Sequence, residues 1–182
     1  MTYYGAKDLA DGLRTVRRNT LIIAEEIPEE SYGFRAAPET RTVAQILTHI
    51  AVVQRIPEQI HAIDRRTTLE GFDFPGLFRS ILAEEQTPRS KVQIIALLRD
   101  EGERWVKWLE SRSDDFLAER VKFPPGMTPP SKTRFEMLLG SKEHEMHHRG
   151  QLMLIERMLG FVPHLTRQMQ ERMSAMSSSP AS

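Results

Sequence analysis

The chain has 182 residues, of which 40% are hydrophobic and 27% charged, as expected for one globular domain with a sizeable core. Lys and Arg number 25, as do Asp and Glu, and this zero net charge argues against non-specific binding to nucleic acid or membrane surfaces. There is no cysteine, which excludes disulfides, thiolate metal ligands and a cysteine nucleophile.

The compartment is predicted from what the sequence lacks. The first twenty residues do not contain the apolar core of a signal peptide. No apolar run approaches the roughly 20 residues that are needed to cross a bilayer. We therefore expect a cytoplasmic protein that contacts neither a membrane nor nucleic acid.

The first predicted helix carries apolar residues at alternating steps of four and three from Leu9 to Ile27, which is typical of one buried helix face. Pro28 ends this pattern. The segment that follows, PEESYGFRAAPET, is rich in Pro, Gly and Glu and is expected to be irregular.

The second predicted helix has a clear start, because Thr42 and Gln45 have the spacing of a capping box. Pro57 lies inside its apolar pattern and removes one backbone hydrogen bond, so we expect a kink near Val53. A connection from about residue 64 to residue 87 follows and contains EGFDFPGLF.

The third helix is predicted to begin near Thr87 or Ser90 and to continue past Trp105 to Leu109. A second long connection contains FPPGMTPPS. The fourth helix is predicted between Thr133, which forms a capping box with Glu136, and Gly160, where a C-terminal cap is expected.

Four amphipathic helices of about 20 to 27 residues pack best as a four-helix bundle, so the predicted fold is all-α with two long connecting loops. No segment has the pattern of a strand. We assign residues 1–163 to the bundle and residues 164–182 to a C-terminal tail. The last seven residues are expected to be disordered, and MQERM is compatible with a short helix.

Within the stretch HEMHHRGQL, His144 and His148 are four residues apart, so on a helix their side chains stack about 6 Å apart. The predicted buried seam runs through Met137, Ser141, His144, His148, Gln151, Ile155 and Met158. Two buried imidazoles without partners cost about 1–3 kcal/mol per polar atom, and a metal ion removes this cost. The alternatives are two satisfied core histidines, or a seam misassigned by one residue.

His49 lies on the inner face of the second predicted helix, three residues after Ile46 and four before Val53. Three inward imidazoles from two helices form a metal site that keeps open coordination positions. Such a site is typical of a catalytic centre rather than of a closed structural one.

The other polar residues near these histidines have weaker predictions. His147 is rotated about 100° from His148 and is expected at the edge of the seam or on the surface. His61 is interpreted as a surface residue, and His164 receives no role. Glu145 is interpreted as a solvated residue, with a role in orienting a histidine or water as the alternative.

His144, Glu145 and His148 also match the H-E-x-x-H pattern of zinc proteases. The expected third ligand is missing, because residues 151 and 154 are Gln and Leu where one protease class has Gly and His. The closest downstream glutamate, Glu171, falls in the predicted tail, and no strand edge is available for a peptide substrate. The pattern therefore does not favour a protease.

The segments FRAAPETRTVAQILTHIAVVQ and HEMHHRGQL, about a hundred residues apart, resemble the DinB/YfiT-like family of metalloenzymes. The resemblance covers roughly residues 7–160. It implies a four-helix bundle, often dimeric, in which His49, His144 and His148 hold a divalent metal. Characterised relatives include S-transferases and isomerases that use a low-molecular-weight bacterial thiol.

The resulting prediction is a metal-dependent enzyme for small molecules, with a thiol-dependent S-transferase as its specific form and a homodimer as its assembly. Zinc or nickel is the expected metal, with iron and manganese also compatible with three nitrogen ligands. No catalytic residue is assigned. The alternative is a non-catalytic bundle dimer with a structural metal or none.

The substrate pocket is predicted to use aromatic residues of the connections, and polar helix residues are predicted near the metal. The aromatic candidates are Tyr32, Phe34, Phe72 and Phe74. The polar candidates are Glu25, Glu101 and Gln151. Trp105 and Trp108 are assigned to the core and its rim.

Overall fold

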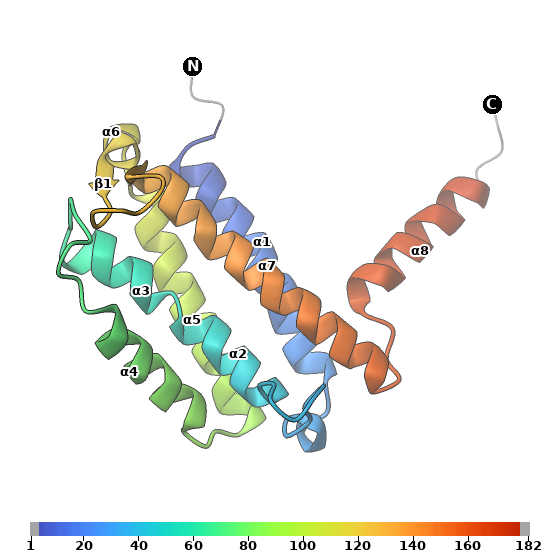
Figure 1. The fold of residues 1–182 in the computed structure, drawn as a ribbon. Coiled ribbons are helices and arrows are strands. Elements are labelled where there is room, and N and C mark those ends of the chain that lie inside the picture. The colour runs from blue at the N-terminus through green and yellow to red at the C-terminus, as the bar shows by residue number, and fades with distance from the viewer. Residues whose placement is uncertain (1–3, 179–182) are drawn as a thin grey trace.

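The structure, a computed structural model, describes residues 4–178 and confirms the predicted all-α four-helix bundle (Figure 1). The bundle consists of α1 (Ala6–Glu26), α2 (Val43–Val52), α5 (Lys91–Glu110) and α7 (Arg134–Met158). The connecting elements are η1 (Glu29–Ser31), α3 (Arg55–Glu58), the π-helical η2 (Gln59–Ile63), α4 (Phe74–Gln86), α6 (Asp114–Ala118), β1 (Arg120–Lys122) and β2 (Ser131–Thr133). Helix α8 (His164–Ser178) follows the bundle.

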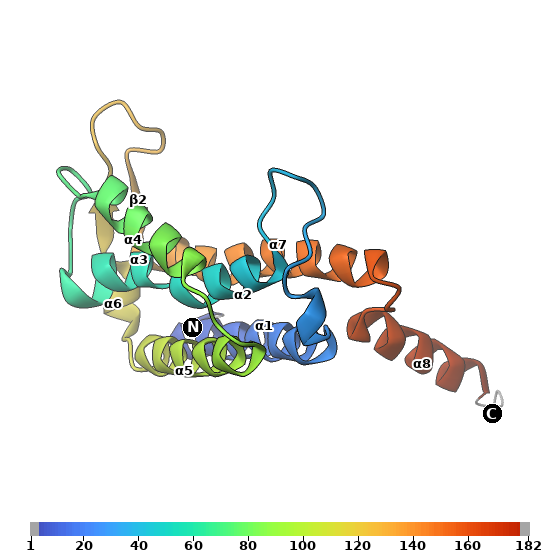
Figure 2. The ribbon, with the colours of Figure 1, turned by 90° about the horizontal axis from the view of Figure 1, so that it is seen from below.

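The bundle helices form two layers. Helix α1 packs against α5 and α7, while α2 packs against α4, α5 and α7. Seen from below, α1 and α5 form one layer, and α2, α4 and α7 form the other (Figure 2). The loop before α2 and the loop between β1 and β2 both rise on the side of the second layer. These loops therefore border the surface formed by α2, α4 and α7.

The predicted capping boxes are present. The Thr42 hydroxyl accepts a hydrogen bond from the Gln45 backbone N–H at 3.1 Å, and the Gln45 side chain accepts one from the Thr42 N–H at 2.9 Å. Thr133 forms the same pair of bonds with Glu136. The kink expected from Pro57 is also present, because α2 ends at Val52 and α3 starts only at Arg55.

The connections contain elements that were not predicted, which are η1, α6, α4 and the β1–β2 pair, and the last two border the candidate site. Helix α4 lies in the first connection, where Asp73 caps it by accepting a hydrogen bond from the Gly76 N–H at 2.8 Å. The second connection contains a small antiparallel pair of strands, with Val121 opposite Lys132. Three-residue strands are too short to show an alternating pattern, and α4 buries only Ile81 and Glu85, so neither element has a strong apolar signature.

The core has two main parts, one toward each end of the bundle. The first includes Ile23, Leu47, Ile50, Leu98 and Leu152. The second includes Leu9, Leu13, Trp105, Leu109 and Leu138. Trp105 is buried and Trp108 stacks on it with ring centroids 4.7 Å apart, as predicted. Between the two parts the bundle interior contains polar side chains, which include the predicted metal ligands.

The buried face of α7 differs from the predicted seam. It runs through Leu138, Ser141, Glu145, His148, Leu152 and Ile155, again at alternating steps of three and four. His144 lies at its flank and is only partly buried, while Gln151 and Met158 are exposed. The prediction was wrong by one residue at positions 137, 144 and 151, because neighbouring positions differ by about 100° and polar residues interrupt the apolar pattern.

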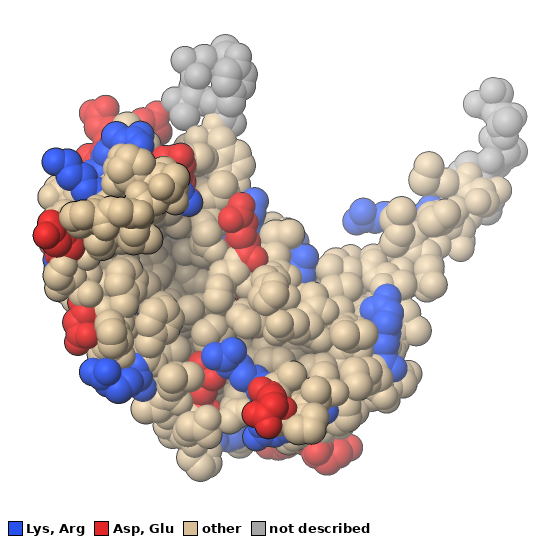
Figure 3. Space-filling view, in the orientation of Figure 1, with Lys and Arg blue, Asp and Glu red and all other residues tan. Residues whose placement is uncertain are grey.

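Figure 3 shows that the face formed by the second layer is hollowed beside the β1–β2 loop, and that the atoms around this hollow are mostly uncharged. Charged side chains gather at the rim instead. Among residues 4–178, no helix combines the length and the apolar character that a membrane span requires.

Residues 164–178 of the predicted tail form helix α8, which projects away from the bundle (Figure 1), and residues 179–182 lie outside the described part. At the junction of α7 and α8, Glu156 is fully buried and neither carboxylate oxygen has a hydrogen-bond partner. Burial and the nearby Glu26 raise the pKa of Glu156 to about 7, and Arg167 and Arg157 oppose this. A protonated, uncharged Glu156 is therefore favoured in the folded protein.

Replacing Glu156 with Gln is expected to stabilise the protein at pH 8 but not at pH 5. The folded-state pKa lies above the unfolded value, so the favourable contribution is complete below about pH 4.5 and is lost as the pH rises through about 7. The glutamine amide avoids a buried, unpaired carboxylate, which costs on the order of 1–3 kcal/mol. Urea unfolding of both proteins at the two pH values measures this difference. An equal difference at pH 5 and pH 8 would contradict the assignment.

Candidate metal centre

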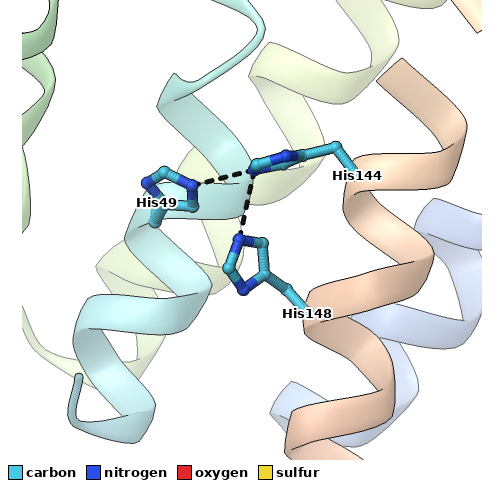
Figure 4. A group of neighbouring side chains, drawn as sticks. All are labelled: His49, His144 and His148. Atoms are coloured by element: carbon cyan, nitrogen blue, oxygen red, sulfur yellow. Dashed lines mark hydrogen bonds between the residues drawn. The ribbon is translucent and has the colours of Figure 1, made fainter. Parts of the chain in front are cut away.

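Three imidazoles from two helices meet between α2 and α7 (Figure 4). The Nε2 atom of His144 lies 2.9 Å from Nε2 of His49 and 3.1 Å from Nε2 of His148. One ligand nitrogen of each residue lies within 4.8 Å of the others. Two nitrogens that each bind one ion at about 2.0–2.1 Å are separated by about 3 Å, so the spacing matches ligands of a common ion.

The backbone explains this convergence. His144 and His148 are one turn apart on α7, so their side chains leave the helix on the same side. His49 lies near the end of α2, directly before the kink, and α2 packs against α7. His49 and His148 are buried, and His144 is partly buried.

Two of the imidazoles are oriented by hydrogen bonds at their other nitrogen. Nδ1 of His49 lies 2.8 Å from one carboxylate oxygen of Glu85, and the other oxygen accepts a hydrogen bond from Arg41 at 2.6 Å. Nδ1 of His148 lies 2.9 Å from the side-chain oxygen of Gln151. Because both partners are acceptors, each Nδ1 carries the proton and each Nε2 presents its lone pair.

The tautomers of His49 and His148 show whether the three Nε2 atoms are suited to bind a metal ion. Nε2 of His49 and Nε2 of His148 both present lone pairs to Nε2 of His144, and a neutral His144 supplies at most one proton there. At least one close contact between two lone pairs therefore remains. A cation between the three nitrogens removes this repulsion, so the donor set fits a divalent ion whose identity stays open.

Burial keeps the imidazoles in the state that binds metals. The pKa of His144 and the pKa of His148 are both lowered to about 4. Burial is the main cause, and the neighbouring histidines contribute to the same shift. Burial raises the pKa of Glu85, but hydrogen bonds from His49 and Arg41 outweigh it, so the net pKa of Glu85 is lowered. At neutral pH the carboxylate is charged and these imidazoles are uncharged.

Glu145 is fully buried, and the prediction that it is solvated was wrong. Its two carboxylate oxygens accept hydrogen bonds from Arg17 at 2.9 and 3.0 Å. The same guanidinium also donates to the backbone oxygens of Leu98 and Ile50. A carboxylate held in this way faces α1 and is not available as the general base that a zinc protease needs.

Of the three remaining histidines, one confirms its prediction, one corrects it, and His164, to which no role was assigned, is buried with Nε2 3.3 Å from the Asn19 side-chain oxygen. His147 is exposed, as expected, and its Nε2 lies 3.1 Å from the side-chain nitrogen of Gln151. His61 is buried, not on the surface, and Nδ1 of its ring lies 3.0 Å from a guanidinium nitrogen of Arg134. Each residue of a π-helical turn advances less around the axis than in an α-helix, so η2 turns His61 inward.

Two cavities lie beside the three histidines. One, which we name the polar cavity, has a volume of about 610 Å³ and is lined by residues that include Arg35, Arg41, Gln45, Glu85 and Gln151. The other, which we name the apolar cavity, has a volume of about 570 Å³ and is lined by His49 and His144 together with Ile60, Phe74, Phe78 and Met137. Both cavities therefore reach residues of the centre or their hydrogen-bond partners.

The predicted pocket residues are only partly correct. Phe74 lines the apolar cavity, and Phe72 packs on it with ring centroids 4.6 Å apart. Tyr32 is buried in the bundle core instead, with its hydroxyl donating to the Ala24 oxygen at 2.6 Å, and Phe34 packs against the same core. Both therefore stabilise the linker.

Among the polar candidates, Gln151 contacts His148 as predicted, whereas Glu101 pairs with Arg55 and Glu25 lies 4.0 Å from Arg99. Glu85 was missed, because the segment that contains it was predicted as a connection. The Asp-Phe-Pro sequence at residues 73–75 is a helix start signal that identifies α4, although not its register.

A family model described as the DinB superfamily matches residues 13–152. No curated protein matches the sequence significantly. Solved structures do match. YfiT from Bacillus subtilis, described as a probable metal-dependent hydrolase with an unusual four-helix bundle topology, is 18% identical with a TM-score of 0.66, over 88% of this chain and 91% of YfiT.

Two further structures are similar. A DinB-like protein from Bacillus cereus is 17% identical with a TM-score of 0.66, over 89% of this chain and 97% of that one. The DinB-like protein YjoA from Bacillus subtilis is 18% identical with a TM-score of 0.62, over 85% of this chain and 93% of that one. At such low identity these similarities establish a shared fold and no more.

Proposed function

Because this chain belongs to the DinB superfamily, we propose that it is a divalent-metal-dependent enzyme for small molecules whose metal ligands are His49, His144 and His148. The observation that carries the proposal is the convergence of three Nε2 atoms, two of which present lone pairs fixed by Glu85 and Gln151. YfiT, which shares the fold, is described as a probable metal-dependent hydrolase.

A divalent ion held by three imidazoles supplies Lewis acidity and lowers the pKa of a water or thiol that it binds. The chain's own residues orient two of the three rings. Glu85 orients the ring of His49, and Gln151 orients the ring of His148. These two rings therefore need little reorientation when they bind an ion. Three protein ligands leave coordination positions open, as in catalytic sites.

The two cavities favour a reaction between two small molecules, and we place a thiol-dependent S-transfer first. The polar cavity, which is lined by charged side chains of both signs, suits a hydrophilic thiol, and the apolar cavity suits an apolar electrophile. In such a transfer the sulfur forms a bond to the electrophilic carbon while the bond to the leaving group breaks. The thiol proton passes to the leaving group or to solvent.

Elemental analysis of the purified protein, combined with turnover assays on small electrophiles, tests this function. We expect about one divalent ion per chain and turnover that requires an added low-molecular-weight thiol. Turnover without an added thiol would show that the protein catalyses hydrolysis and not S-transfer. Bound metal without any turnover, and without a spectral response of the cobalt-substituted protein to thiols, would support a structural site instead.

Replacing Glu85 with Gln is expected to weaken metal binding by about 10–100-fold, because partners that orient a metal-binding histidine have effects of this size. Gln keeps the shape of the side chain but removes the charge that fixes the Nδ1 proton of His49. Glu84→Gln is the matched control, since Glu84 pairs with Arg55 and Arg89 and not with a histidine. Competition with a metal indicator dye measures both affinities. Equal affinities would show that Glu85 does not orient the ligand.

A further inference from the structure

Three residues that line the apolar cavity each carry a buried polar atom that has no hydrogen-bond partner. These are Nε2 of His61, the hydroxyl oxygen of Ser141 and the side-chain oxygen of Gln54, and all three residues line the cavity. Each of these residues is less than 9% exposed. A buried polar group without a partner costs about 1–3 kcal/mol, so three of them around one cavity indicate a place where a ligand supplies the missing bonds.

The proton on His61 is assigned by its partner. Arg134 is fully buried and can only donate hydrogen bonds, so Nδ1 of His61, at 3.0 Å, accepts one. A neutral His61 therefore carries its proton on Nε2. Burial, with the charge of Arg134 as a second cause, lowers the pKa of His61 to about 4, which keeps the ring neutral. A residue that lines the cavity thus carries a fixed N–H donor.

The position of this donor is built into the fold. His61 lies in the π-helical segment η2, and π-helical turns are frequent at functional sites. Arg134, the first residue of α7, is itself held by Glu119 at 2.8 Å. The donor is therefore supported by two helical elements, η2 and α7, and does not depend on a flexible loop.

The rest of the lining suits an uncharged, apolar part of a ligand. Apart from the histidines, no lining residue is ionisable, and the walls include apolar side chains from α3, α4, α7 and the β1–β2 loop. Away from His49 and His144, an ion placed against these walls would lose its hydration without an opposite charge to replace it. Phe78 and Met127, which line the cavity, are 48% and 52% exposed, so they lie at its entrance.

We propose that the apolar cavity binds an uncharged, largely apolar carbonyl compound, whose oxygen accepts a hydrogen bond from Nε2–H of His61. The proposal rests on the proposed function in that this compound, with a leaving group on or next to its carbonyl carbon, is the electrophile for the metal centre, of which His49 and His144 line the cavity. His61 is then a substrate-binding residue that polarises the carbonyl and sets its position.

Equilibrium dialysis with two probes of nearly the same shape tests the proposal. One probe is 2-acetylnaphthalene, which has a carbonyl oxygen, and the other is 2-ethylnaphthalene, which does not. The ratio of their affinities is compared between the parent protein and His61→Phe, so that differences in hydrophobicity cancel. We expect this ratio of affinities to be about tenfold smaller in the variant, which is the effect of losing one such hydrogen bond. An unchanged ratio would overturn the role of His61.

Gly140→Phe tests the location independently of His61. A Cβ at Gly140 meets no atom within 4 Å, and Gly140 lines the cavity, so the phenyl group is expected to occupy it. Both probes should then bind at least tenfold more weakly. Gly150→Phe is the matched control, because Gly150 lies on α7 with equally open space but outside the cavity lining. Probe binding that Gly140→Phe leaves unchanged, or no binding to the parent protein, would overturn the proposal.

Repeating the dialysis after chelator treatment separates this proposal from the proposed function. If the carbonyl preference persists in metal-free protein and disappears in His61→Phe, the oxygen is bound by His61. If the preference requires the metal, the oxygen is bound there and the proposal is wrong. If the protein binds no metal but still prefers the carbonyl probe, the proposed function is wrong, whereas the role of His61 in binding the carbonyl oxygen stands.

Discussion

Replacing His148 with Ala is expected to abolish stoichiometric metal binding while the protein remains a folded helical bundle. The substitution removes one of three converging nitrogens and also the partner of Gln151. Loss of a residue that merely orients a ligand costs about 10–100-fold in affinity, so loss of a ligand itself should exceed about 100-fold. Metal content after dialysis, with circular dichroism as the folding check, measures the result.

His147→Ala is the matched control for this substitution. It removes an imidazole from the neighbouring position of the same helix, but His147 is exposed and is not a member of the three-nitrogen group. We expect it to keep about one ion per chain. If His148→Ala holds metal as tightly as the parent protein, the assigned centre is wrong.

Replacing Arg17 with Met is expected to destabilise the protein by about 3–5 kcal/mol, because it leaves the carboxylate of Glu145 buried without its partner. Arg17 also satisfies the backbone oxygens of Leu98 and Ile50, which would lose a donor. The site is closely packed, since a methyl group at Gly102 would clash with the guanidinium. Urea unfolding measures the loss.

A second substitution separates charge from packing. In the double variant Arg17→Met, Glu145→Leu no buried charge is left unpaired, so most of the lost stability should return. Arg14→Met is the control, because Arg14 lies one turn earlier on α1 and forms exposed ion pairs with Asp11 and Glu110, which contribute little. If Arg17→Met is as mild as Arg14→Met, the buried pair is not a major source of stability.

The histidine spacing alone identified the two helices that carry the candidate centre. His144 and His148 are four residues apart, and any regular helix brings such side chains to one side. His49 could be paired with them because Ile46 and Val53 mark the inner face of its helix. The helix starts at Thr42 and Thr133 were equally clear, since a capping box depends only on residues within one turn.

The residues that surround the centre could not be predicted in the same way. Glu85 reaches His49 only because α4, a helix with a weak apolar pattern, packs against α2. Glu145 was assigned to solvent because a helix pattern interrupted by polar residues has no unique register, and its partner Arg17 is 128 positions away. His61 was assigned to the surface because an ideal helical wheel does not include a π-helical turn.

The features that depend on local geometry could be predicted from the sequence: the helix limits, the four-helix class and the three histidines as a group. The packed helices were needed to show which polar groups fix those histidines, which carboxylate Arg17 neutralises, and which nitrogen of His61 carries its proton. The physical reason is that hydrogen bonds and burial depend on distances between helices that are far apart in the chain. Periodicity gives the direction of a side chain, but it does not identify the partner that the side chain meets.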